Sequence, residues 1–269
     1  MGGRIEYKYL VPVELMEKIR ADIQPYLAPD PFTEAATKGE YSVRSIYYDT
    51  PYLDCYHEKD AGVDERNKYR IRGYGTDPSN SIVFLEIKKR LGPAIDKHRA
   101  SLKLSDLPEF LASPDIPKHI FKTPGAPRAP EDARRFLYHY YRLCLQPAVL
   151  VVYNREAFFG KYDTSLRVTF DKAIRGQLAP QLSDLHSERC LTPVMKDHFV
   201  LELKFFHRSL PQWASELIGR YNLPRMALSK FVLCLDLVPQ RAHIRSRVLP
   251  APGYDQAPQA SEQASEVLG

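Results

Sequence analysis

One stretch of the sequence, from Arg66 to Arg99, constrains the fold more than any other. It contains the runs RNKYRIRGYG, SIVFLEIKKR and IDKHR, which are separated by segments rich in turn-forming residues. Because successive side chains of a β-strand alternate between its two faces, the first run places four cations on one face, namely Arg66, Lys68, Arg70 and Arg72. The stretch therefore predicts an antiparallel meander of three strands with a cationic face.

The charges of this meander are nearly all of one sign. Between residues 66 and 103 the cations are Arg66, Lys68, Arg70, Arg72, Lys88, Lys89, Arg90, Lys97, Arg99 and Lys103, and the acids are Asp77, Glu86 and Asp96. Two cations about 6 Å apart repel each other by roughly 3 kcal/mol at an effective dielectric constant near 20. Screening would make this tolerable on a solvated outer face, but such faces normally mix both signs. We therefore favour the alternative, in which the cations line a cavity for a polyanion such as a chain of phosphates.

The same alternation recurs along the chain and predicts further strands. Apolar residues fall on one parity and a few charges on the other in the segments 4–11, 148–160, 165–176 and 197–206. The segment 41–51 is rich enough in β-branched and aromatic residues to be a further strand. Helical patterns lie between these strands, at about 13–27 and 131–145, and after the last of them, at about 211–223 and 226–238. The count is about eight strands. We therefore expect an α+β fold that is mainly β, built on a closed eight-stranded antiparallel β-barrel. The charged faces of its strands would point inward, and their apolar faces would pack against flanking helices.

The length of 269 residues and the absence of a clear linker predict a single domain over residues 1–244. The following segment, 245–269, has almost no large apolar residues, so we expect a flexible tail. The four cysteines form no C-x-x-C pair, and no apolar run is long enough to span a bilayer. These features predict a soluble, cytoplasmic protein.

A set of short motifs in a fixed order resembles a known family. The motifs are R-x-E-x-K at 4–8, V-R-S-I-Y-Y-D-T-P at 43–51, R-x-K-x-R-I-R at 66–72, L-E-I-K at 85–88, K-x-R at 97–99, Y-x-R at 153–155, L-E-L-K at 201–204 and L-S-K-F at 228–231. Each piece alone is weak, but the ordered set extends over residues 4 to 236. It resembles the triphosphate tunnel metalloenzymes (CYTH-like), and within them the catalytic domain of the vacuolar transporter chaperone (VTC) group, which makes polyphosphate.

The resemblance implies an eight-stranded antiparallel tunnel that holds a triphosphate or the phosphate tail of ATP. The phosphate-binding cations would be Lys8, Arg70, Arg72, Lys88, Lys97, Arg155, Lys204 and Lys230, and Arg66, Lys68 and Arg99 would extend the cluster. Glu202, aided by Glu6, would ligate a divalent cation, Mn²⁺ or Mg²⁺. The implied reaction is transfer of the ATP γ-phosphate to a growing polyphosphate chain. The partners would then be ATP and inorganic polyphosphate or pyrophosphate, and no membrane partner is evident in this chain.

Two other functions stay open at this point. One is an inorganic triphosphatase that hydrolyses tripolyphosphate or a nucleoside triphosphate, and the other is a non-catalytic polyanion binder. Hydrolytic members of the superfamily typically begin with E-x-E-x-K, whereas Arg4 replaces the first glutamate here, which favours phosphate binding over metal-dependent hydrolysis. Nucleic acid is disfavoured as a partner, because the cationic strand positions lack interleaved exposed aromatic residues.

Three of these residues also have simpler structural interpretations. Glu86 could pair with Lys88 or with a cation of a neighbouring strand, and Glu202 could be a counter-ion for Lys204. Lys230 lies in an apolar helix, where a single lysine most often extends outward to solvent. Only the resemblance to the family places Lys230 in a binding site.

Overall fold

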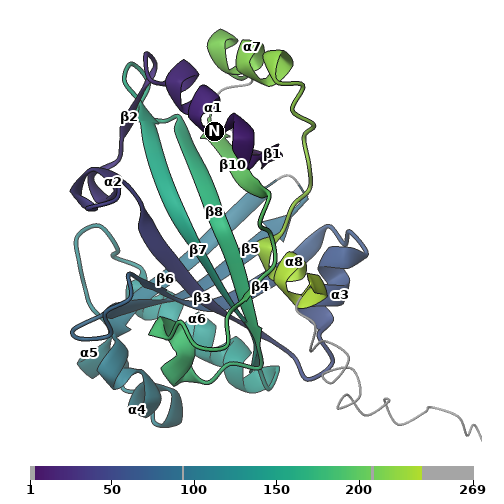
Figure 1. Cartoon of the computed structure of the whole chain (residues 1–269). Coiled ribbons are helices and arrows are strands. Elements are labelled where there is room, and N and C mark those ends of the chain that lie inside the picture. Colours follow the sequence, from purple (N-terminus) through teal and green to yellow (C-terminus); the bar gives the residue numbers. More distant parts are fainter. Residues whose placement is uncertain (1–3, 93, 207–208, 238–269) are drawn as a thin grey trace, which may run out of the picture.

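The computed structural model describes residues 4–92, 94–206 and 209–237. Its main element is one antiparallel sheet of ten strands (Figure 1), in which eight strands follow the order β1-β10-β8-β7-β3-β4-β5-β6. The bounds of these eight are β1 Ile5–Pro12, β3 Tyr41–Asp49, β4 Glu65–Tyr74, β5 Ile82–Leu91, β6 Ala94–Lys103, β7 Gln146–Gly160, β8 Arg167–Leu178 and β10 His198–Phe205. Two short strands, β2 (Leu27–Pro29) and β9 (Thr192–Pro193), pair with β7 and β8.

The predicted cationic meander is confirmed as β4-β5-β6. All of its strand pairs are antiparallel, and its registers place three lysines in one cross-strand row, Lys68 opposite Lys88 and Lys88 opposite Lys97. In the next row Arg70 lies opposite Glu86, which lies opposite Arg99. The alternation that was read from the sequence therefore gathers these side chains on one face of the sheet.

The prediction of a closed eight-stranded barrel is wrong, because the sheet is open. In the described part of the chain its two edge strands, β1 and β6, do not pair with each other. Their outward backbone groups have other partners. The carbonyl of Lys8 on β1 accepts from Met226 N–H (2.9 Å), and the carbonyl of Ser101 on β6 accepts from Phe121 N–H (2.9 Å). Alternation fixes which side chains share a face, but it does not decide whether the edges meet.

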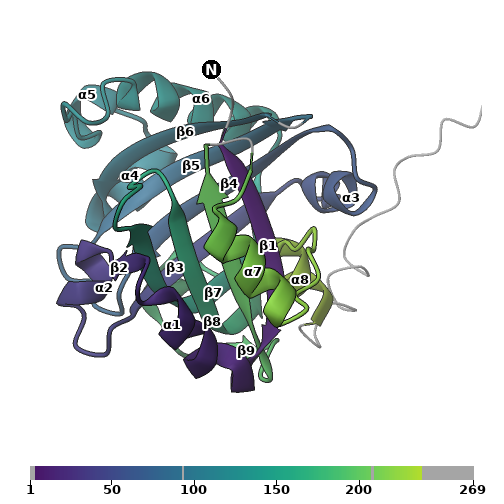
Figure 2. The same ribbon diagram turned by 90° about the horizontal axis from the view of Figure 1, so that it is seen from above.

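Helices cover the apolar side of the sheet at both of its ends (Figure 2). Under β3–β6 lie α4 (Leu107–Ala112), α5 (Ile116–His119) and α6 (Ala129–Arg142), which build a core with buried residues such as Ile71, Leu85 and Phe136. Under β1, β10 and β8 lie α1 (Met16–Ile23) and α7 (Gln212–Arg220), around Phe170 and Phe199. The helices thus occupy the side of the sheet that the sequence pattern made apolar.

The charged side of the sheet is partly covered by a third group of elements. The helix α8 (Lys230–Leu237) packs Phe231 against Tyr47 of β3, with ring centroids 5.1 Å apart, and against apolar residues of β7 and β10. A neighbouring helix, α3 (Asp54–Asp60), adds Tyr56 to the same core. This apolar end of the charged face was not anticipated from the sequence.

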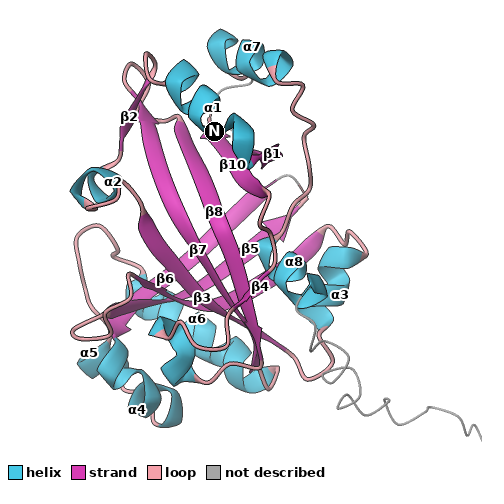
Figure 3. Ribbon diagram, in the orientation of Figure 1, coloured by secondary structure: helices cyan, strands magenta, loops and turns pink. Residues whose placement is uncertain are grey.

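The remaining elements are short. They are α2 (Pro31–Ala35) and three 3₁₀ turns, Val13–Leu15, Leu104–Asp106 and Leu182–His186. Figure 3 shows the strands as one sheet with the helices around it. None of the helices in the described segments has the length and apolar character that a bilayer span requires. The predicted domain end at residue 244 and the predicted flexible tail, 245–269, lie outside the described residues.

Candidate functional site

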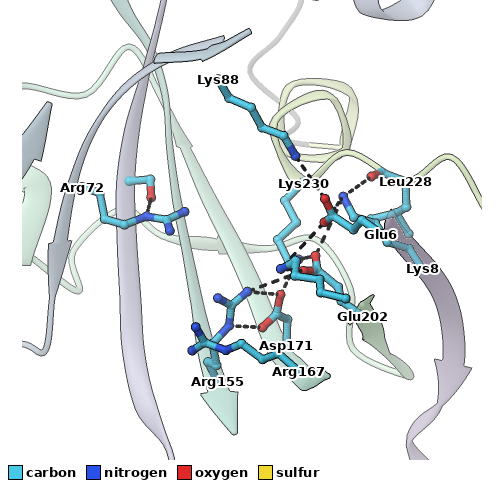
Figure 4. Close-up of polar contacts among 12 residues, drawn as sticks. Glu6, Lys8, Arg72, Lys88, Arg155, Arg167, Asp171, Glu202, Leu228 and Lys230 are labelled. Carbon is cyan, nitrogen blue, oxygen red and sulfur yellow. Dashed lines mark hydrogen bonds and ion pairs between the residues drawn. The ribbon is translucent and has the colours of Figure 1, made fainter. Parts of the chain in front are cut away.

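A cluster of ten cationic side chains and four carboxylates lies on the charged face of the sheet, which we call the cationic face. The cations are Lys8, Lys68, Arg70, Arg72, Lys88, Lys97, Arg99, Arg155, Lys204 and Lys230, and the carboxylates are Glu6, Glu86, Asp171 and Glu202. The cations come from β1, β4, β5, β6, β7, β10 and α8. Every predicted phosphate-binding residue is therefore on this face, and Figure 4 shows part of the cluster.

Glu202 on β10 is the most heavily paired carboxylate of the cluster. One of its oxygens accepts from Lys204 Nζ at 2.6 Å and the other from Lys230 Nζ at 2.8 Å, while Lys8 and Arg155 approach to 3.8 Å. The carboxylate is almost fully buried, which alone would raise its pKa. The surrounding cations outweigh burial and hold the pKa of Glu202 well below its ordinary value. Glu202 is therefore an anion at any physiological pH.

Asp171 on β8 belongs to the same cluster, although the sequence analysis missed it. Its two oxygens accept from Arg155 at 2.7 and 2.8 Å, and one of them also lies 2.5 Å from Lys230 Nζ. This fork fixes the orientation of the Arg155 guanidinium. The sequence did indicate the position of Asp171, because Arg167, Thr169 and Asp171 occupy every second position of the strand and therefore share one face.

Lys230 opens α8 and points into the cluster rather than outward to solvent. Its ammonium group contacts Asp171 and Glu202, and it lies 4.9 Å from the ring centroid of Tyr153. Burial would lower its pKa, but the two carboxylates raise it above the ordinary value for lysine. The simpler interpretation of Lys230 as a lysine that extends outward is therefore wrong.

Glu6 connects the two ends of the sheet. Its carboxylate lies 3.3 Å from Lys8, 3.1 Å from Lys88 and 3.8 Å from Lys204. Burial acts against the charged form, but the lysines lower the pKa of Glu6 to about 2. Because Lys88 belongs to β5 and Glu6 to the opposite edge strand β1, the cationic face is concave.

Glu86 on β5 is the counter-ion of the arginines. It accepts from Arg70 at 2.6 Å and lies 3.3 Å from Arg99 and 3.8 Å from Arg72. Arg70 also donates to the Tyr47 hydroxyl at 2.8 Å, and Arg72 donates to Ser45 Oγ at 3.1 Å. The structure supports the interpretation of Glu86 as a partner of strand cations, and those cations are arginines rather than Lys88.

In the described segments, the ammonium groups of two lysines of the cationic face have no carboxylate within 4 Å. Lys68 donates to Ser229 Oγ at 2.6 Å, and its pKa is lowered well below the ordinary value by burial and by nearby cations such as Lys8 and Lys88. The Lys97 side chain is exposed on the edge strand, but desolvation by the surrounding protein and the charge of Arg70 lower the pKa of Lys97 to about 7. An anionic ligand would supply the missing partner for both.

The predicted residue Arg66 lies at one end of the cationic face, beyond the row of lysines. Its guanidinium hydrogen-bonds to the carbonyl of Val63. Burial and the nearby Arg90 lower the pKa of Arg66. Burial also lowers the pKa of Lys59, and the charges of Arg66 and Arg90 lower it further. Arg66 is thus part of a cationic end of the face, and it does not contact the carboxylate cluster.

The carboxylates of the cationic face could hold a hard divalent cation only together with oxygen atoms of a bound substrate. In the described segments, no three His, Cys, Asp or Glu side chains are arranged to hold a metal ion. Glu6 and Glu202 are nevertheless held near each other, because Lys8 and Lys204 each approach both carboxylates within 3.8 Å. Mg²⁺ is commonly held by one or two carboxylates together with substrate phosphates. The two carboxylates predicted as metal ligands are thus close together, although each oxygen of Glu202 already accepts from a lysine.

Comparisons with known proteins give one family match. The family model that describes the VTC domain matches residues 3–238. A search of curated protein sequences gives no match. Among solved structures, the chain is similar to the PH1819 protein from Pyrococcus horikoshii OT3, with 15% sequence identity and a TM-score of 0.42, over 87% of this chain and 98% of that chain. That structural likeness is too low to add to the argument.

Proposed function

Because the chain belongs to the VTC domain family, we propose that it is a metal-dependent polyphosphate polymerase. It would transfer the γ-phosphate of ATP to the end of a growing inorganic polyphosphate chain. VTC domains are associated with polyphosphate synthesis, and the observation that carries the proposal is the large excess of cations over carboxylates on one concave face. An oligophosphate is a ligand whose linear array of charges would neutralise that excess.

The cations would bind and orient the two phosphate substrates. Arginines hold phosphate oxygens bidentately, and Arg70, Arg72 and Arg155 are already oriented by Glu86, Ser45 and Asp171. The lysines act as point charges, and among the described residues no carboxylate lies within 4 Å of the ammonium groups of Lys68 and Lys97. Phosphoryl transfer needs positioning and neutralisation of charge more than covalent catalysis, and this arrangement provides both.

In the reaction, a terminal oxygen of the polyphosphate chain forms a bond to the γ-phosphorus of ATP. The bond from that phosphorus to the β,γ-bridging oxygen breaks, and ADP leaves with the electron pair. Glu202 and Glu6, together with phosphate oxygens, would hold a divalent cation, which would supply Lewis-acid stabilisation of the developing charge. Lys204 and Lys230 keep Glu202 ionised and fixed in place.

The protonation states favour transfer to phosphate over hydrolysis. A phosphate oxygen is already an anion and needs no base, whereas an attacking water must lose a proton. The pKa values of Glu6 and Glu202 are lowered, so both carboxylates are weak bases, and both oxygens of Asp171 are engaged by Arg155. Arg4, which replaces a glutamate of the hydrolytic relatives, adds a cation near Phe206 rather than a carboxylate.

One assay separates polymerase, triphosphatase and simple binding. The protein is incubated with ATP and Mn²⁺, the products are separated on a gel that resolves long phosphate chains, and phosphate release from tripolyphosphate is measured in parallel. We expect long chains that disappear in the Arg70→Ala variant and persist in Arg134→Ala, whose arginine is exposed on α6. Release without chains would identify a triphosphatase, and binding without either product would identify a polyanion-binding protein.

A further inference from the structure

The two ends of the cationic face differ in chemistry. One end carries Lys59, Arg66 and Arg90 beyond the row of lysines. The other end carries a row of rings, Phe32, Tyr41, Tyr74 and Phe84, contributed by α2, β3, β4 and β5. Successive ring centroids lie 6.1, 6.2 and 5.9 Å apart. A ligand that carries only phosphate does not need such a row.

A groove of about 830 Å³ opens beside the last ring of this row. It is lined by Phe84, Lys97, Arg99, Ser101, Phe121 and Asp132, among others. Its volume lies in the range of about 300–1,000 Å³ that small-molecule sites occupy. Two of the lining residues, Lys97 and Arg99, also belong to the cationic face, so the groove continues directly from the proposed phosphate site.

The walls of the groove present flat surfaces. The guanidinium of Arg99 lies 3.6 Å from the centroid of the Phe84 ring, and it also approaches the Tyr74 hydroxyl at 3.4 Å. Phe121 lies on the connection after α5, and its N–H donates to the carbonyl of Ser101 on the edge strand. Nucleobases stack on aromatic rings and on guanidinium planes in this way, without sequence selectivity.

We infer that this groove binds the nucleoside part of the ATP donor, with the base against Arg99 and Phe121 and the phosphates extending along the cationic face. The inference rests on the proposed function and adds a direction to it. The γ-phosphate then points away from the aromatic row, toward the row Lys68–Lys88–Lys97 and the end that carries Arg66. The growing chain occupies that cationic end, and ADP departs from the aromatic end.

Binding measurements with ATP and tripolyphosphate test the inference, because the two ligands share phosphates and differ in the nucleoside. Titration calorimetry is done on the whole chain with EDTA present, so that metal-dependent transfer does not occur. Phe121→Ala and Phe84→Leu are expected to weaken ATP binding about tenfold and to leave the Kd of tripolyphosphate within about twofold. Tyr162→Ala, which removes a ring that is 91% exposed on the turn between β7 and β8, is the control.

The outcomes separate this inference from the proposed function. Selective loss of ATP binding in the two phenylalanine variants supports the groove as the nucleoside site. If the variants bind both ligands as the wild-type protein does, or lose both equally, the nucleoside site is wrong and the proposed function stands. If the wild-type protein binds neither ligand, the proposed function fails and the inference fails with it.

Discussion

Lys88 on β5 and Glu6 on β1 form an ion pair of 3.1 Å, although five strands lie between them in the order of the sheet. The pair places Lys88 at the centre of the concave face, where it is also opposite Lys68 and Lys97 in the strand registers. Like charges directly opposite each other destabilise a sheet. The lysine row is therefore a cost to the free protein that an anionic ligand would remove.

This relationship predicts opposite effects of one substitution on the free and the bound protein. In Lys88→Met, the row loses a repelling charge while Glu6 keeps Lys8 and Lys204, so the melting temperature without ligand should be unchanged or a few degrees higher. The rise in melting temperature caused by tripolyphosphate should shrink, because a ligand stabilises in proportion to its affinity for the native state.

Thermal melts with and without tripolyphosphate, compared with melts at matched ionic strength, measure both effects. Lys118→Met is the control, since Lys118 is an exposed partner of Glu109 and lies on α5, which covers the apolar side of the sheet. A Lys88→Met protein that melts lower without ligand and keeps the full ligand-induced rise would contradict the role given to this row.

Glu202→Gln should cost both stability and activity. Lys204 and Lys230 would each lose their shared counter-ion in a buried site, and removal of one partner of a buried ion pair typically costs about 3–5 kcal/mol. Denaturant unfolding measures the loss of stability, and polyphosphate synthesis from ATP measures the loss of activity. Glu65→Gln, which removes an exposed partner of Lys89, should change neither.

The sequence sufficed to identify the cationic face, because strand parity is a local property. Arg70, Lys88 and Lys204 face the same side for the same reason, and the motif order supplied Lys230, which parity could not. The family prediction is confirmed by the match to the VTC domain. The alternation of side chains along each strand predicts which residues share a face of the sheet, and the structure confirms this prediction.

The closure of the sheet could not be predicted, because it depends on contacts between residues far apart in the chain. The edge of β1 pairs with the segment around Arg225, and the edge of β6 binds Phe121 and Asp132. No local pattern distinguishes these edge contacts from strand pairing. Strand parity places Asp171 on the cationic face, but its pairing could not be predicted locally, since its partners, Arg155 and Lys230, come from another strand and a distant helix.

The carboxylates of the cationic face should make the protein sensitive to acid. The pKa of Glu6 is lowered to about 2, so its ion pairs stabilise the fold fully above its unfolded pKa of about 4.5 and are lost as the pH falls toward 2. A shift of this size corresponds to roughly 3 kcal/mol. Urea unfolding between pH 6 and pH 2 should therefore show a smaller loss of stability in Glu6→Gln than in the wild-type protein. Parallel curves for the two proteins would contradict the ion pairing of Glu6.

Lys97 should make phosphate binding depend on pH in a defined direction. Its pKa is lowered to about 7 in the free protein, so above pH 7 the side chain is largely neutral, and binding of an anion must add a proton to recover the charge. At pH 8.5 the wild-type protein should take up close to one proton more per bound tripolyphosphate than Lys97→Arg does, because arginine is charged throughout. Calorimetric titrations in buffers with different ionisation enthalpies measure this uptake. Equal proton uptake by the two proteins would place Lys97 outside the phosphate site, whereas the expected difference would assign it a direct contact with the bound anion.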